Sequence, residues 1–323
     1  MFDQEARQWL LRLLGPNVRF DEPMAPYTSF RIGGPADALV LPESESQLKE
    51  ILRWARQGRI PYLVIGGGTN LLIRDGGIRG LVIHLGRLGT EISWEVEAEQ
   101  VHLQAGAAVP TRRLCRIALR QGWQGLNFAL GIPGTLGGGI SMNAGTAGGT
   151  MVDVLEAITA MTADGKIIRL ARESMRAQYR CLRLLDEVDG GGIGRAILLN
   201  GELNLSTGDR QLIREEACTL MRQRVRRQPE WHRSAGCFFK NPSADASAGF
   251  LIDKAGLKGL RIGDAQVSRQ HANFIVNLGG ARAADVLALA SRIQDRVQSL
   301  TGISLVPEVR VVGEEKTDTP KPL

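Results

Sequence analysis

The pattern of apolar and polar positions begins with a short amphipathic helix. Between residues 3 and 14, four leucines recur at helical spacing among charged and polar side chains. The pair Gly15-Pro16 ends this pattern, because glycine favours a helix end and proline lacks an amide hydrogen. We therefore predict an N-terminal helix within residues 1–16.

The next part of the chain alternates strand-like and helix-like patterns. The run ALVLP (38–42) is typical of a strand, residues 44–56 have helical spacing, and YLVI (62–65) is typical of another strand. A further apolar run, LVIHL (81–85), predicts one more strand. We expect these elements to form a small α/β lobe over residues 17–86.

Residues 87–208 have mainly the two-residue period of antiparallel strands. ISWEV and VHLQAG flank residues 97–100 as the two strands of a hairpin would, and Asp164-Gly165 is a strong hairpin signal. Pro110 and Gly122 stand at the start and the end of a helical pattern. The run AILLNGELNLS adds a strand, so we predict a second, mixed lobe.

The last part of the chain is again a mixture of helices and strands. A helical pattern spans 209–227, a second long one spans 283–300, and SLVPEVRVV (304–312) is typical of a strand. Short strands and a short helix are expected between the two long helices. We predict an α+β domain over 209–313 and, because the composition of the last residues is polar and proline-bearing, a disordered tail over 314–323.

The positive charge of the chain does not by itself indicate nucleic acid. The net charge is +6 and the isoelectric point is near 9.4, but lysine and arginine are dispersed and few aromatic residues lie among them. We expect a basic but ordinary surface, no nucleic-acid partner, and a few charges that meet a phosphorylated small molecule.

Cysteine and histidine spacing does not favour a metal site. The four cysteines and four histidines show neither CxxC nor HxxxH spacing, so we predict reduced thiols and no metal. The first residues carry charges within their apolar pattern, unlike a signal peptide, and no apolar run reaches the roughly 18 residues of a membrane-spanning helix. We expect a cytoplasmic protein with no membrane partner.

Two glycine-rich stretches are the strongest candidates for a ligand site. GGGTNLL (66–72) follows a buried-strand pattern, and consecutive glycines let backbone amides approach an anion; a plain tight turn is the alternative. It is not the Rossmann fingerprint, because Leu71 occupies the sixth position of GxGxxG and no clear helix follows. The second stretch, GIPGTLGGGISMNAG (131–145), has interleaved apolar residues and predicts an ordered loop with a packed underside. A ligand as long as a dinucleotide, held between two lobes, fits this arrangement.

An ordered set of motifs resembles one enzyme family along nearly the whole chain. YTSFRIGGPAD, VIGGGTNLLIRDGGIRGLVI and GIPGTLGGGISMNAG are similar to the FAD-binding half of the MurB family, the UDP-N-acetylenolpyruvoylglucosamine reductases. The similarity continues through QYR, RRQP, SAGCFFKNP, AGFLIDKAGLKG, HANFIVN and PEVR. The resemblance implies an α+β protein: a two-lobed FAD-binding domain of the vanillyl-alcohol-oxidase-like (PCMH-type) fold, followed by a C-terminal α+β substrate domain.

The resemblance also implies a reaction and a cofactor. In the family, NADPH reduces FAD, and the reduced flavin then converts UDP-N-acetylglucosamine enolpyruvate into UDP-N-acetylmuramate. The residues expected to bind FAD lie on the FRIGG motif and on the two glycine stretches: Arg31, Gly66, Gly67, Gly68, Thr69, Asn70, Pro133, Gly134, Thr135, Gly138 and Asn143.

Three motif positions are implied to be catalytic. Negative charge builds up on the substrate carboxylate and on C2 during the reaction, so the site needs a clamp and a proton donor. Arg180 of QYR suits the clamp, because a guanidinium can grip a carboxylate at two points. Glu308 of PEVR, placed in an apolar strand, is expected to be protonated or paired with arginine. Cys237 stands where the family usually has serine, and a thiol can also donate a proton.

The resemblance supports the substrate contacts more weakly. Tyr179, Lys240, Asn241, Lys254 and Lys258 are expected to meet the sugar nucleotide, with solvated side chains as the alternative. The compact segment after Arg180 lacks a long insertion, which indicates the shorter type II form of the family; a monomer is expected. Another oxidoreductase of the same fold and a flavin-binding protein without catalysis remain alternative hypotheses.

Overall fold

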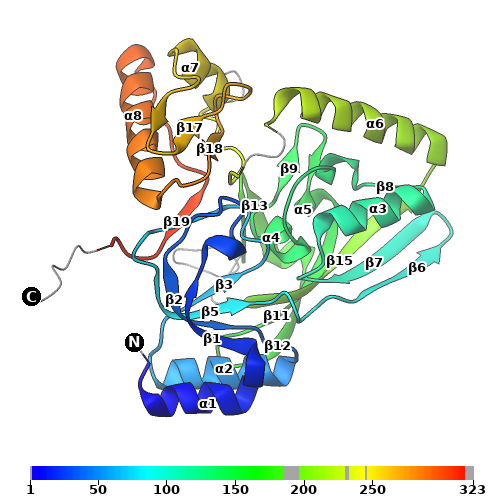
Figure 1. Cartoon of the computed structure of the whole chain (residues 1–323). Helices are drawn as coiled ribbons and strands as arrows, with labels where there is room; N and C mark the ends of the chain where they lie inside the picture. Colours follow the sequence, from blue (N-terminus) through cyan, green and yellow to red (C-terminus); the bar gives the residue numbers. More distant parts are fainter. Residues whose placement is uncertain (1, 185–195, 230–232, 244–245, 317–323) are drawn as a thin grey trace, which may run out of the picture.

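The computed structural model describes residues 2–184, 196–229, 233–243 and 246–316. Two lobes and a C-terminal unit meet around the middle of the molecule, with the N-terminal helices at one end and the C-terminal unit at the other (Figure 1). The short segments that carry the predicted site motifs converge where the three parts meet.

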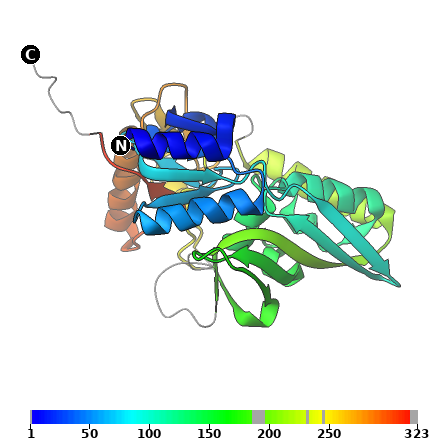
Figure 2. The ribbon, with the colours of Figure 1, turned by 90° about the horizontal axis from the view of Figure 1, so that it is seen from below.

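Lobe 1 is a four-stranded sheet with two helices on one face. The sheet order is β1-β2-β5-β3, with β1 antiparallel to β2 and the other pairs parallel. Apolar side chains of both helices pack on the sheet in one buried cluster, and the two helices lie side by side beneath it (Figure 2). The elements are α1 (Gln4–Leu14), β1 (Val18–Pro23), β2 (Pro35–Val40), α2 (Glu45–Gln57), β3 (Tyr62–Ile65), β4 (Leu71–Ile73) and β5 (Ile78–His84).

Lobe 2 is built on an antiparallel sheet of order β12-β11-β15-β7-β6, and the predicted hairpins are present. Helix α3 ends at Gly122, which has a left-handed φ of 78° as the sequence predicts. The elements are β6 (Ile92–Glu97), β7 (Gln100–Gly106), α3 (Thr111–Gln121), β8 (Trp123–Gln124), α4 (Leu136–Ser141), β9 (Gly145–Thr146), β10 (Gly149–Thr150), α5 (Met151–Val154), β11 (Leu155–Met161), β12 (Ile167–Ala171), β13 (Met175–Gln178), β14 (Cys181–Leu184) and β15 (Ile197–Thr207).

Helix α6 (Arg210–Arg227) packs against lobe 2. It contacts α3 and the turn at Asn127–Ala129, and its buried side chains Ile213 and Ala217 face that lobe. We expected this helix with the substrate domain from its place in the sequence. Its packing instead makes it the outer wall of lobe 2, from which the chain continues into the C-terminal unit (Figure 1).

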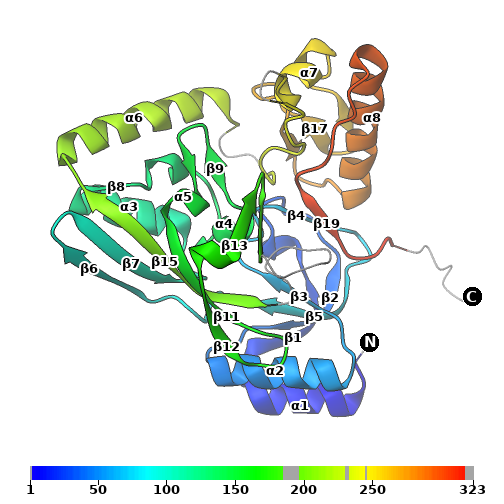
Figure 3. The same cartoon turned by 180° about the vertical axis from the view of Figure 1, so that it is seen from behind.

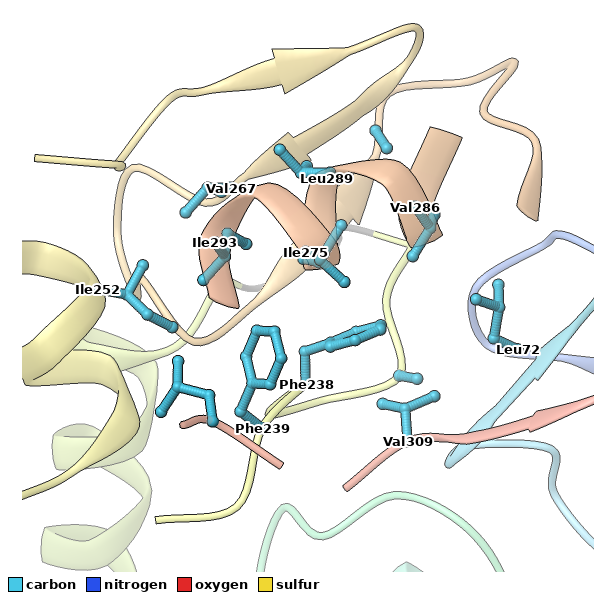
Figure 4. Close-up of a cluster of buried hydrophobic side chains, with 14 of the residues drawn as sticks. Leu72, Phe238, Phe239, Ile252, Val267, Ile275, Val286, Leu289, Ile293 and Val309 are labelled. Atoms are coloured by element: carbon cyan, nitrogen blue, oxygen red, sulfur yellow. The ribbon is translucent and has the colours of Figure 1, made fainter. Parts of the chain in front are cut away.

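The C-terminal unit is a three-stranded sheet covered by two helices. Phe238 and Phe239 lie at the centre of its core, against Ile252, Ile275 and the inner face of α8 (Figure 4). The elements are α7 (Ala248–Lys254), β16 (Arg261–Ile262), β17 (Ala265–Val267), β18 (Ile275–Asn277) and α8 (Ala283–Thr301). No helix in the described part of the chain is both long and apolar enough to cross a membrane.

The last strand corrects two predictions. Within the predicted strand 304–312, only Arg310–Val312 forms a strand, β19. These residues have left the C-terminal unit and pair in parallel with β4 of lobe 1 (Figure 3). The predicted disordered tail begins too early, since Glu314 and Glu315 are ordered: the carbonyl of Glu314 accepts from the amide of Gly76 at 2.9 Å, and Glu315 pairs with Arg74.

Candidate active site

The two glycine-rich stretches lie against each other. Thr69 Oγ1 donates to the carbonyl of Pro133 at 3.4 Å. A Cβ added to Gly66 would lie 2.6 Å from Thr135 Oγ1, and one added to Gly67 would lie 3.0 Å from the Cα of Gly134. Side chains at these positions would push the loops apart, so the glycines are needed for the close approach.

Gly68 has a different reason to be glycine. Its φ is +60°, and an added Cβ would lie 2.0 Å from the carbonyl oxygen of Tyr27. Its own carbonyl accepts from the amide of Ser29 at 3.1 Å. Gly68 therefore ties the first stretch to the segment that carries Arg31, an exposed residue whose Nη1 donates to the carbonyl of Pro26 at 2.8 Å.

The second stretch forms a helix where we predicted a loop. Thr135 caps α4, and its Oγ1 accepts from the amide of Gly138 at 3.5 Å. Gly138 is exposed, and an added Cβ would meet only Thr135 Oγ1, at 3.7 Å. The sequence LGGGIS has poor helix propensity; here Leu136 and Ile140 are fully packed in the core of lobe 2, which outweighs that propensity.

Asn143 connects the end of this stretch to the catalytic segment. It is buried and has a φ of 38°. Its Oδ1 accepts from the amide of Val152 at 3.1 Å, and its Nδ2 donates to the carbonyl of Gln178 at 3.5 Å. The side chain thus links the end of the second stretch to α5 and to the segment that carries Arg180.

This cradle fits the phosphates of a dinucleotide. Residues 66–70 and 133–138 meet across the two lobes, contain no acidic side chain, and include the open, exposed backbone at Gly138. Bare backbone and the amide end of α4 together suit an anion. The residues present therefore fit the FAD that the fold implies.

The three predicted catalytic residues are brought together from three parts of the molecule. Arg180 follows β13 in lobe 2, Cys237 precedes the two phenylalanines of the C-terminal unit, and Glu308 lies on the segment that returns to lobe 1. The Nε of Arg180 lies 2.8 Å from Oε1 of Glu308, and the two side chains are only 23% and 13% exposed. The sequence prediction that Glu308 is paired with arginine is correct.

Arg180 is held in an unusual conformation. Its φ is 58°, one of six positive values among the described residues other than glycine, and its Nη1 donates to the carbonyl of Gly145 at 3.0 Å. Its Nε is buried and takes part in the ion pair with Glu308. Positive-φ residues are frequent where backbone geometry serves a site.

Burial keeps Cys237 and Glu308 protonated over a wider pH range. Burial, and then the charge of Glu308, raises the pKa of the Cys237 thiol to about 11, against the opposing effect of Arg180 and Arg224. Burial also raises the pKa of Glu308, while Arg180 and Lys240 lower it. A neutral thiol beside a cationic guanidinium is a suitable proton donor to a developing carbanion.

Backbone hydrogen bonds fix these two groups relative to each other. The amide of Glu308 donates to the carbonyl of Phe238 at 2.8 Å, and Cys237 bridges to Phe274. Buried Asn273 holds the same strand, because its Oδ1 accepts from the amide of Phe239 at 2.9 Å. The acid and the thiol are therefore held by two hydrogen-bonded backbone segments that adjoin Phe238 and Phe239 of the aromatic core (Figure 4).

Arg224 belongs to this site and was not predicted. Its Nη1 donates to the carbonyl of Leu130 at 3.1 Å, burial lowers its pKa, and its charge acts on Cys237. The signal was in the sequence: Arg224 continues the buried stripe of Ile213 and Ala217 along α6. A charged residue at an apolar position of a helix indicates a function.

The predicted substrate residues are not all brought to this site. Lys240 lies near enough to lower the pKa of Glu308, and the exposed ring of Tyr179 lies 5.2 Å from the guanidinium carbon of Arg180.

The other three have local surroundings. Asn241 is exposed, and its Oδ1 accepts from the amide of Ala248 at 3.1 Å at the start of α7. Lys258 pairs with Asp253 at 2.6 Å, and Lys254 is exposed. The type II prediction rests largely on residues 185–195, which lie outside the described part of the chain.

Comparison with known proteins gives one consistent result. Residues 36–171 match the family described as FAD binding domain, and residues 228–312 match the family described as UDP-N-acetylenolpyruvoylglucosamine reductase, C-terminal domain. The second match begins after α6, in agreement with the packing of that helix on lobe 2.

Whole-length relatives carry the same description. The UDP-N-acetylenolpyruvoylglucosamine reductase of Desulfosudis oleivorans is 44% identical over 313 residues, 97% of this chain and 100% of that protein. That of Syntrophus aciditrophicus is 43% identical, over 92% and 93% of the two chains. The crystal structure of the reductase MurB from Thermus caldophilus superimposes with a TM-score of 0.76 at 36% identity, covering 91% of this chain and 99% of that one. The predicted FAD-binding domain followed by an α+β C-terminal domain is confirmed.

Proposed function

The chain belongs to the family of UDP-N-acetylenolpyruvoylglucosamine reductases, and from that premise we propose how its own residues divide the reaction. It is a flavin-dependent oxidoreductase that uses NADPH to reduce UDP-N-acetylglucosamine enolpyruvate to UDP-N-acetylmuramate in peptidoglycan precursor synthesis. Bound FAD supplies the hydride chemistry: it accepts a hydride from NADPH and delivers one to C3 of the enolpyruvyl group.

The cradle of the two glycine stretches holds the cofactor in this proposal. Backbone amides of residues 66–70 and 134–138 would meet its phosphates, and Arg31 would lie near them, because its segment is tied to Gly68 through Ser29. Thr69 and Thr135 support the cradle from within, since their hydroxyls bond to the facing loop and to α4.

Arg180 clamps the substrate carboxylate. Its fixed position is the observation that carries this assignment: the guanidinium is paired with the Glu308 carboxyl and bonded to the carbonyl of Gly145, at a residue with a positive φ. A guanidinium that is held in place and partly out of water grips an incoming carboxylate more strongly than a solvated one. Charge that builds up on the carboxylate during reduction is then stabilised where it forms.

Cys237 donates the proton that C2 receives. The thiol S–H bond breaks, the proton bonds to C2, and the resulting thiolate is stabilised by Arg180 and Arg224. Glu308 holds Arg180 in place. Because burial raises its pKa, Glu308 takes up a proton more readily than an ordinary carboxyl. Tyr179 and Lys240 are proposed to contact the sugar nucleotide at the rim, with Asn241, Lys254 and Lys258 farther out.

The reaction takes place in the cytoplasm in this proposal, where NADPH and nucleotide sugars are made. A monomer suffices, because Arg180, Cys237, Glu308 and the cradle come from one chain.

One assay tests the proposal as a whole. The FAD-loaded protein is mixed with NADPH and with UDP-N-acetylglucosamine enolpyruvate, and NADPH absorbance and product mass are followed. We expect NADPH to be consumed in proportion to substrate, with UDP-N-acetylmuramate as the product. Oxidation of NADPH that depends on oxygen and not on the substrate would refute the assignment.

A further inference from the structure

Asn70 lies where all three parts of the molecule meet. It is the last residue of the cradle segment 66–70 and directly precedes β4 in lobe 1. Its backbone carbonyl accepts from the amide of Arg310 at 3.0 Å, and its Nδ2 donates to the backbone carbonyl of Glu308 at 3.2 Å. The same Nδ2 lies 3.7 Å from the sulfur of Met142, at the end of the second glycine stretch.

Glu308 is consequently held from three sides. Its amide is bonded to Phe238 of the C-terminal unit, its carbonyl to Asn70 of lobe 1, and its carboxyl to Arg180 of lobe 2. The Phe238 bond fixes Glu308 relative to Cys237, and the Asn70 bond fixes it relative to the cradle. Without Asn70, the segment that carries Glu308 loses its side-chain link to lobe 1.

We propose that Asn70 is a positioning residue that sets Glu308, and through it Arg180, relative to the cofactor cradle. The proposal rests on the function assigned above to Glu308 and Arg180. It differs from the cofactor contact that the sequence resemblance implied for Asn70, because the amide side chain is directed at the catalytic segment.

The chemistry of the side chain explains why an amide stands here. The Glu308 carbonyl needs a donor, which asparagine supplies; aspartate has none when ionised and would place negative charge against the carbonyl. In the parallel β4–β19 pairing, Leu71 lies opposite Arg310. Asn70, one residue before Leu71, is therefore close enough for its side chain to contact the carbonyl of Glu308. A displacement of about 1 Å in a catalytic group can cost up to about a hundredfold in rate.

The test compares Asn70→Ala and Asn70→Asp with a matched control, Asn127→Ala. Asn127 Nδ2 also donates to a backbone carbonyl, that of Ile213, at 3.2 Å, but between lobe 2 and α6. Four quantities are measured: FAD affinity of the apoprotein, thermal midpoint, flavin reduction by NADPH, and anaerobic flavin reoxidation by substrate.

We expect Asn70→Ala to slow reoxidation about tenfold, and Asn70→Asp more, while FAD affinity and flavin reduction stay within about threefold of the parent. The pH profile of reoxidation should also move, because a displaced Glu308 loses the Arg180 contact that lowers its pKa; its titration then shifts to higher pH. Asn127→Ala should change the thermal midpoint without changing that profile.

Loss of FAD affinity with unchanged reoxidation per bound flavin would overturn the proposal, and so would equal slowing of both half-reactions or no change in either. Glu308→Gln separates this failure from failure of the assigned function. If Glu308→Gln slows reoxidation but Asn70→Ala does not, only the positioning role is wrong. If Glu308→Gln leaves reoxidation unchanged, the role of Glu308 itself is wrong.

Discussion

The cofactor cradle and the catalytic cluster solve the same problem, recognition of an anionic ligand, by opposite means. The cradle consists of bare backbone in two glycine stretches, with no side chain that titrates near neutral pH. The cluster consists of partly buried, titratable side chains, Arg180, Cys237 and Glu308, contributed by three separate segments. Cofactor binding in the cradle therefore depends on backbone shape, whereas the reaction in the cluster depends on charge and protonation. Substitutions should affect one function without the other.

The largest expected effect is in the cluster alone. Cys237→Ala removes the proposed proton donor, so reoxidation of flavin by substrate should slow by about two to four powers of ten. Flavin reduction by NADPH should stay near the parent rate, and Cys237→Ser should restore much of the loss. Anaerobic stopped-flow absorbance on each half-reaction measures this, with exposed Cys218→Ala as the control. Undiminished reoxidation in the alanine variant would reduce Cys237 to a packing role.

A smaller but still large effect is expected for Arg180→Lys. Lysine keeps the charge but loses the planar fork, so kcat should fall roughly a hundredfold. The control is Arg169→Lys, which removes a guanidinium bonded to Glu202 at 2.9 and 2.6 Å outside the site. Steady-state assays of both variants decide the question; a lysine variant with parental kcat would place the carboxylate clamp elsewhere.

Two glycines sharpen the cradle side of the comparison. Gly138→Ala adds a methyl group to open space, so stability should hold while FAD affinity falls about tenfold through the obstructed backbone. Gly68→Ala should instead unfold more easily by at least about 1–2 kcal/mol, because alanine resists a φ of +60° and its Cβ would also lie 2.0 Å from the carbonyl oxygen of Tyr27. Apoprotein titration with FAD and thermal melting measure the pair. Equal FAD binding by Gly138→Ala and the parent would show that this backbone does not contact the cofactor.

The smallest expected effect is a pH dependence confined to the cluster. Because the pKa of Cys237 is about 11 among Glu308, Arg180 and Arg224, reoxidation should be nearly flat from pH 7 to about 10 and fall only as the pH approaches 11. Burial disfavours the charged thiolate, so the neutral thiol stabilises the folded protein at pH values below its ordinary pKa near 9. This stabilisation is lost as the pH rises through 11. Cys237→Ser should abolish both effects. A decline centred near 9 would mean a solvated thiol.

The sequence predicts features that depend on neighbouring residues better than features that depend on contacts between distant parts of the chain. Strand YLVI and the Asp164-Gly165 hairpin follow from local pattern and were predicted correctly. Helix α4 was missed because its glycines have poor propensity and only the core around Leu136 makes it helical.

The site divides in the same way. The motifs named Arg180, Cys237 and Glu308 and predicted an arginine partner for Glu308, but not that the partner is Arg180, 128 residues away, which only tertiary packing determines. Arg224 was not predicted, because it lies with Arg226 and Arg227 in the basic last turn of α6.

The parallel pairing of β4 with β19 also determines when the site can form. Leu71 and Arg310 are partners separated by 239 positions, so a very long loop must close before Glu308 reaches its place. Contacts of such sequence separation form slowly and late in folding. During synthesis, Glu308 is added after both glycine segments of the cradle, so the catalytic cluster can be completed only when nearly the whole chain has been made.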